Sequence, residues 1–183
     1  MLLRRSRPEI ETRPVDPVAG LEHLQAEAVA VLRWLAARRV EHVLVGEFAR
    51  SVRGERDATG PVAIVPAPYG RNLERLARAL HIAHARLRVG RPEEENAAIK
   101  LTADKLARPQ RWELRCGAHD LDIEGPASGL PTYEELLYEA GVFELEPGLR
   151  VQVGSPEDIG RFAHAHRVDR EIRITRRDRE PAS

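Results

Sequence analysis

Cysteine and long apolar runs are both scarce in this chain of 183 residues, and each scarcity excludes a class of protein. The single cysteine, Cys116, cannot form an intramolecular disulfide, so we predict a cytoplasmic protein rather than a disulfide-stapled secreted one. No apolar run approaches the roughly 18 residues of a membrane-spanning helix, and no membrane partner is expected. The charged first residues lack a following apolar segment, which argues against a signal peptide.

A net charge of either sign is also missing, because 29 basic residues balance 29 acidic ones. Proteins that bind nucleic acid through bulk charge normally carry a basic excess, so the composition argues mildly against that role. The basic residues are arginine except for Lys100 and Lys105. This bias, together with abundant alanine and leucine, is typical of a GC-rich genome, and we expect a bacterial protein.

The chain has enough apolar residues, 42%, for one domain with its own core. We expect residues 1–15 to form a flexible N-terminal arm, residues 16–170 the folded domain, and residues 171–183 a C-terminal tail. The pair Asp16-Pro17 is typical of a helix start, and apolar residues recur at helical spacing from there to Leu35.

Helical and strand patterns alternate through the rest of the domain. Strands are predicted at 41–46, 61–66, 98–102, 111–116 and 119–125, and a hairpin at 142–154. Helices are predicted at 47–54 and near 73–80, after a capping box of Thr132 and Glu135, and after the cap Ser155. A polar loop is expected at 90–98. The order predicts a single α+β domain, with a mixed sheet flanked by helices.

The segment 43–80 has the frame of a phosphate-handling site. A strand ends at Gly46 and leads into a helix, and the N–H groups of a helix N-terminus bind phosphate. Two acids at i and i+2 on the next strand would project to one face and could hold Mg²⁺ against a triphosphate. At these two positions the chain carries Pro61 and Ala63. The frame is present, and the expected carboxylates are not.

This pattern resembles the small nucleotidyltransferases of the polymerase-β superfamily, in the bacterial branch that includes toxin-like nucleotidyltransferases. The family signature is Gly-Gly or Gly-Ser after a hydrophobic residue, then a short spacer and an Asp-hydrophobic-Asp strand. Here Gly46 begins the signature, Glu47 takes the second small position, and residues 48–60 form the spacer before Pro61 and Ala63. The resemblance implies a nucleotidyltransferase-like fold.

Later segments carry the same resemblance, which covers most of residues 20–170. The segment 119–124 is similar to the family's strand with the third acid, for which Asp122 is the closest match and Asp120 lies on the same face. A solvated strand face is the alternative interpretation of these two acids. Residues 133–159 resemble the helix, hairpin and Ser-x-Glu-Asp of the family's C-terminal portion.

The departures from the family pattern predict a pseudoenzyme. Pro61 and Ala63 carry no side-chain oxygen, and Asp122 alone makes a poor Mg²⁺ site. Glu47 places a carboxylate where phosphate would approach, and like charges at about 4 Å repel by about 1 kcal/mol in water or about 4 kcal/mol at an effective dielectric near 20. The last helix lacks the lysine that family members often carry there. We therefore expect no metal or cofactor, and the same departures argue against binding of nucleoside triphosphates.

A binding or regulatory role is the function that this interpretation predicts, with a protein partner expected and RNA as the second candidate. Arg50 and Arg53 could line the degenerate pocket and contact an anion, or they could form a solvated basic face. The alternative is an active Mg²⁺-dependent enzyme that moves a nucleoside monophosphate to RNA, protein or a small molecule. Glu55 and Asp57, also spaced i and i+2, would then have to supply the acids after a register shift.

Overall fold

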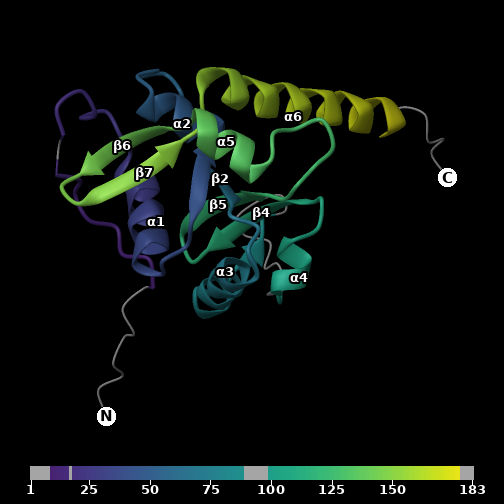
Figure 1. Ribbon diagram of the computed structural model, residues 1–183, viewed down its shortest axis with the longest axis horizontal. Helices are drawn as coiled ribbons and strands as arrows, with labels where there is room; N and C mark the ends of the chain where they lie inside the picture. Colours follow the sequence, from purple (N-terminus) through teal and green to yellow (C-terminus); the bar gives the residue numbers. More distant parts are fainter. Residues whose placement is uncertain (1–8, 17, 89–98, 178–183) are drawn as a thin grey trace, which may run out of the picture.

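A computed structural model describes residues 9–16, 18–88 and 99–177, with the side chains of 174–177 left out (Figure 1). The helices are α1 (Ala26–Ala37), α2 (Gly46–Val52), α3 (Gly70–Ile82), α4 (Ala103–Leu106), α5 (Tyr133–Glu139) and α6 (Pro156–Arg177). The strands are β1 (His42–Val45), β2 (Val62–Pro66), β3 (Arg86–Leu87), β4 (Arg111–Cys116), β5 (His119–Glu124), β6 (Gly141–Glu146) and β7 (Leu149–Val153).

The strands of the described residues form one mixed sheet in the order β3-β4-β5-β2-β1-β7-β6. Strand β2 pairs parallel to β5 and β1 pairs parallel to β7, whereas the other neighbours are antiparallel. All five residues of the central strand β2 are buried, as expected for a strand that is covered on both faces. The predicted α+β class, with a mixed sheet flanked by helices, is confirmed.

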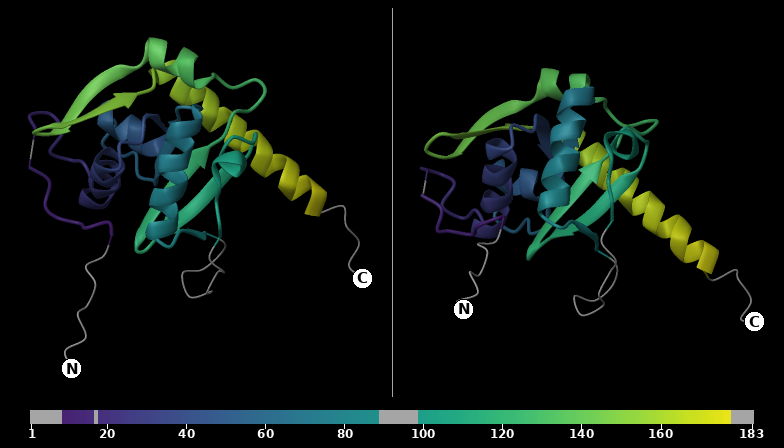
Figure 2. Two further views of the ribbon diagram at one scale, coloured as in Figure 1. Left: turned by 60° about the horizontal axis from the view of Figure 1, so that its bottom comes forward. Right: turned by 90° about the horizontal axis from the view of Figure 1, so that it is seen from below.

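The two faces of the sheet are covered by different helices. Val62 and Ile64 of β2 face the larger core, to which α1 and α3 contribute their apolar sides. Ala63 packs into a smaller cluster with Tyr133 of α5 and Phe162 of α6. This alternation follows from the period of two along a strand. The C-terminal half of α6 extends beyond the rest of the fold (Figures 1 and 2).

Helix α1 begins at Ala26 and not at Asp16, so the predicted helix start is wrong. Gly20 has a φ of +89°, a left-handed conformation that a helix cannot contain. Two turns, closed by the N–H groups of Leu21 and Leu24, lead from it to the helix. Leu24 is nevertheless buried in the larger core, so the apolar stripe is correct although its first part is not helical.

Both expected boundaries of the domain lie within structured segments. Ile10 is buried in the larger core, and the Thr12 hydroxyl lies 2.7 Å from Nε2 of His119, so the described part of the arm packs on the domain. Helix α6 runs through residue 170 to Arg177. A helix ends where its hydrogen-bond ladder ends, and a loss of apolar residues does not by itself break that ladder.

The hairpin, the capping box and the cap at Ser155 are confirmed. The strand predicted at 98–102 is wrong for residues 99–102, which lead into α4 with Thr102 as its N-cap. The loop predicted at 90–98 lies outside the described residues. Strand β3 was not predicted, because two residues give no usable pattern. Among the described helices, none combines the length and apolar character that crossing a bilayer requires.

Candidate functional site

The turn between β1 and α2 lies directly on strand β2. Gly46 has a φ of +74°, and a Cβ at this position would lie 2.9 Å from the Cβ of Ala63. A Cβ on Gly60 would similarly lie 2.6 Å from the Cβ of Glu47. Real side chains do not approach so closely, so both positions need glycine. The predicted order of strand, glycine turn and helix is therefore present, and Gly46 of the turn packs closely against Ala63.

The parallel pairing of β2 with β5 places Ala63 directly beside Asp122. Both residues, together with Pro61, line a cavity of about 570 Å³, which we call the central cavity. The structure thus brings together the three positions that the family pattern would fill with acids. The other residues that line it come from α2, β4, α6 and the segment after β3, and are Gly46, Glu47, Arg50, Arg88, Arg111, Glu113, Ile159, Ala163, His166, Arg167 and Arg170.

Two arginines hold the carboxylate of Asp122, whose side chain is 1% exposed. Arg88 donates from Nη2 to Oδ1, and Arg111 donates from Nη2 to Oδ2, each over 2.9 Å. Burial raises the pKa of Asp122 above its ordinary value, and the two guanidinium groups oppose that rise. Each carboxylate oxygen of Asp122 therefore already has a cationic partner.

A further set of polar contacts leads from this centre to helix α6. Arg111 Nη1 lies 3.2 Å from Glu113, and Arg111 Nε lies 3.1 Å from Oε1 of the buried Glu124. The same Glu124 oxygen lies 2.9 Å from Nε2 of His166. Because Glu124 is in β5 and His166 is in α6, this contact lies between the sheet and the helix beside the cavity.

The residues present do not fit a Mg²⁺ ion at this place. Mg²⁺ is held by carboxylates together with phosphates and water. Pro61 and Ala63 offer no side-chain oxygen, and both oxygens of Asp122 accept from arginine. Within the part of the chain that the structure describes, there is no group of three or more His, Cys, Asp or Glu that could hold a metal ion.

Glu47 and Arg50, both predicted at the pocket, line the central cavity and contact each other. Arg50 Nη1 donates to the Glu47 carboxylate over 3.1 Å, and Arg50 also pairs with Glu55. These two acids, Glu55 first, raise the pKa of Arg50. Glu55 and Asp57, the acids proposed for a register shift, do not line the cavity. The charge of Glu47 is therefore offset within its own helix.

Arg53 was expected to line the pocket, and it lies beside the central cavity without lining it, in an adjoining pocket that also includes Arg50. It donates from Nε to the carbonyl of Gly154 over 2.7 Å and from Nη2 to that of Val153 over 3.2 Å. Its guanidinium lies 5.2 Å from the centre of the Phe143 ring. Burial lowers the pKa of Arg53. This arginine holds the junction between β7 and α6, which is a structural role.

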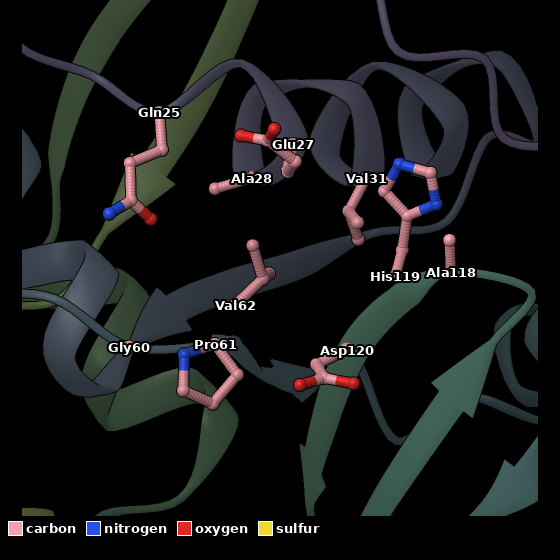
Figure 3. A pocket seen from close by; sticks show the side chains of 10 residues that line it. All are labelled: Gln25, Glu27, Ala28, Val31, Gly60, Pro61, Val62, Ala118, His119 and Asp120. Carbon is pink, nitrogen blue, oxygen red and sulfur yellow. The ribbon is translucent and has the colours of Figure 1, made fainter. Parts of the chain in front are cut away.

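Asp120 lines a neighbouring cavity of about 340 Å³ and not the central one (Figure 3). In Figure 3, side chains of α1 such as Glu27 form one wall, and His119 and Asp120 of β5 form another. Asp120 pairs with Arg115 over 3.0 Å, and Arg88 Nη1 lies 3.7 Å from its second oxygen. Asp120 and Asp122 thus share an arginine but face different cavities.

Several residues of the central cavity were missed from the sequence, although some could have been found. The β4–β5 turn at Gly117 sets a register in which Glu113 lies opposite Asp122, so the positively and negatively charged side chains of both strands share one face. His166 and Arg170 follow Ile159 at helical spacing on α6. Arg88 gave no signal, because it follows a strand of two residues.

Comparisons with known proteins support the fold alone. No family model matches the chain, and no curated protein matches it. Among solved structures, the chain is similar to a candidate nucleotidyltransferase from Thermotoga maritima, with 16% sequence identity and a TM-score of 0.51. The likeness covers 84% of this chain and 93% of that protein. The chain therefore has a nucleotidyltransferase-like fold.

Proposed function

We propose that this chain is a catalytically inactive descendant of polymerase-β nucleotidyltransferases, from their toxin-like branch, that acts as a binding or regulatory module. One observation carries the proposal: both carboxylate oxygens of Asp122 are held at 2.9 Å by Arg88 and Arg111. Guanidinium groups occupy the positions from which a metal ion would be bound. The module needs no cofactor, and its expected partner is a protein, with RNA as the second candidate.

The energetics support this proposal. A hydrogen bond to a charged group contributes roughly 1.5–3 kcal/mol, so a metal would have to displace two such bonds before it reached Asp122. Mg²⁺ also gives up its water reluctantly and demands nearly octahedral geometry. Ala63 beside Asp122 supplies no oxygen in return. The absence of the acidic pair and the two arginine hydrogen bonds to Asp122 therefore both weaken metal binding.

An active enzyme is the competing function, and one contact favours it. Glu113 lies directly opposite Asp122 in the sheet, and both line the central cavity. These two acids, instead of Glu55 and Asp57, are the pair that could bind Mg²⁺ if the arginines moved away. Arg111 contacts both of them, and Arg88 holds Asp122, so both arginines would have to leave.

Titration calorimetry with ATP, GTP, CTP and UTP, each with and without Mg²⁺ or Mn²⁺, separates the two functions. We expect no metal-dependent affinity and no transfer of labelled nucleotide. The matched control for Asp122→Ala is Asp120→Ala, on the same strand but in the neighbouring cavity. Metal-dependent affinity that Asp122→Ala removes and Asp120→Ala retains would establish an active metal site and overturn the proposal.

Restoring the family residues tests the proposed descent. The variant Glu47→Gly, Pro61→Asp and Ala63→Asp should create a divalent-metal site, measured as Mn²⁺ binding. Replacing Arg88 and Arg111 by glutamine in the same variant should strengthen that binding, because the carboxylate of the third acid is then released. If Mn²⁺ binds neither variant although both fold, the proposed placement of the ancestral metal site is wrong.

A further inference from the structure

The central cavity gathers positive charge in a chain whose total charge is zero. Its lining includes five arginines and three acids, namely Arg50, Arg88, Arg111, Arg167 and Arg170 against Glu47, Glu113 and Asp122. Each of the three acids has an arginine within 3.2 Å. The acids are thus neutralised locally, and the surplus is cationic.

The surplus is located on helix α6. Arg167 and Arg170 lie one turn apart, line the cavity, and have exposed side chains. Neither forms an ion pair with any other side chain that the structure describes. Their N–H donors are therefore available to a ligand, whereas Arg50 and Arg111 already contact acids.

A buried donor on the sheet side of the cavity also lacks a partner. Arg88 Nη1 is buried and forms no hydrogen bond, since its contact with Asp120 Oδ2 is 3.7 Å long. This donor faces Asp120 and the neighbouring cavity, so the unpaired N–H groups that the central cavity presents are those of Arg167 and Arg170 on α6.

We propose that the central cavity binds a phosphate group directly through Arg167 and Arg170, without a metal ion. The planar guanidinium group matches the oxygens of phosphate and forms paired hydrogen bonds with them. A volume of about 570 Å³ is within the range of small-molecule sites. The proposal rests on the inactive, metal-free function above, and it names the ligand of the same site.

The expected repulsion by Glu47 does not prevent this binding. Arg50 holds the Glu47 carboxylate over 3.1 Å, so the phosphate meets an ion pair at the turn and not an isolated negative charge. The phosphate has two sources: a small phosphorylated molecule, or the terminal phosphate of an RNA. Both present the same dianionic group to the arginines, and they differ in what extends out of the cavity.

The test is calorimetry in EDTA with inorganic pyrophosphate, and with one short RNA prepared with and without a 5′-phosphate. We expect pyrophosphate or the phosphorylated RNA to bind, and the double variant Arg167→Gln, Arg170→Gln to bind at least about tenfold more weakly. Arg173→Gln is the matched control, since Arg173 is exposed on the same helix but does not line the cavity, and it should bind as the wild type does. Stronger binding of the phosphorylated RNA assigns the RNA as the source, and stronger binding of pyrophosphate assigns a small molecule.

Two results would overturn the inference: in EDTA, neither pyrophosphate binding nor RNA binding that depends on the 5′-phosphate, or a weakening by Arg173→Gln equal to that of the double variant. These failures are distinct from failure of the proposed function. Absence of phosphate binding under every condition leaves the inactive module intact. Binding that requires Mg²⁺ and is lost in Asp122→Ala removes both proposals.

Discussion

Replacing Asp122 by alanine should lower the free energy of unfolding by about 2 kcal/mol. The change removes two charge-assisted hydrogen bonds of 2.9 Å, each worth roughly 1.5–3 kcal/mol. Removing one partner of a buried pair costs about 3–5 kcal/mol when the other charge is left without compensation. Here the cost is smaller, because Arg88 and Arg111 are 19% and 31% exposed and keep contacts with other acids. Burial also raises the pKa of Asp122, so the ionised carboxylate itself carries a desolvation cost that its removal relieves.

Urea unfolding followed by tryptophan fluorescence measures this change, because Trp34 and Trp112 are both buried. A loss of about 2 kcal/mol is a roughly thirtyfold change in the folding equilibrium, and at a slope of about 2 kcal/mol per M it moves the midpoint by about 1 M. Asp120→Ala is the control, since its side chain is 38% exposed and its pair with Arg115 is a surface pair worth about 0–1 kcal/mol. If the two variants lose the same stability, the arginines do not hold Asp122 as the geometry indicates.

Three further predictions concern other parts of the fold. Arg33 holds the pKa of Glu146 below its ordinary value through two hydrogen bonds of 2.6 and 2.9 Å. A carboxyl group whose pKa is depressed in the folded state stabilises the fold above its unfolded pKa, and this stabilisation is lost as pH falls through the folded pKa. Glu146→Gln should therefore lower the free energy of unfolding by about 1–2 kcal/mol at about pH 7 and by much less at about pH 3. Urea titration at the two pH values measures the difference. Gly46→Ala should lower the free energy of unfolding by about 2 kcal/mol, because φ is +74° and the new methyl group would lie 2.9 Å from the Cβ of Ala63. The melting temperature should fall, and an unchanged melting temperature would contradict the tight turn. Burial raises the pKa of Cys116 to about 12, so a thiol reagent at ~pH 8 should label it only in denaturant, and equal rates in native buffer would show that the strand opens.

Local sequence patterns were sufficient for most of the individual elements. The hairpin of β6 and β7 follows from alternation around Pro147 and Gly148, and the start of α5 follows from the reciprocal bonds of Thr132 and Glu135. Such signals depend on residues that are close together in the chain, so they can be recognised without knowledge of the fold. The helix start predicted at Asp16 is wrong, because Gly20 is left-handed and interrupts residues whose spacing is otherwise helical.

Contacts between distant residues could not be predicted in this way. Arg50 and Arg53 are spaced by three on one short helix, and both were expected at the pocket. Arg50 lines the central cavity, whereas Arg53 donates to the carbonyls of Val153 and Gly154, about a hundred residues away in the chain. A flexible arginine side chain takes the acceptors that packing brings within reach, and the helix alone does not indicate which acceptors those are.

The absence of metal-binding oxygens at Pro61 and Ala63 is a property of the residue types, which no arrangement of the backbone could change. That Asp122 meets Arg88 and Arg111 was decided in space, by the antiparallel pairing of β4 with β5 and by the path of the chain after β3. Side-chain chemistry is set residue by residue, whereas the partner of a buried charge depends on which strands become neighbours.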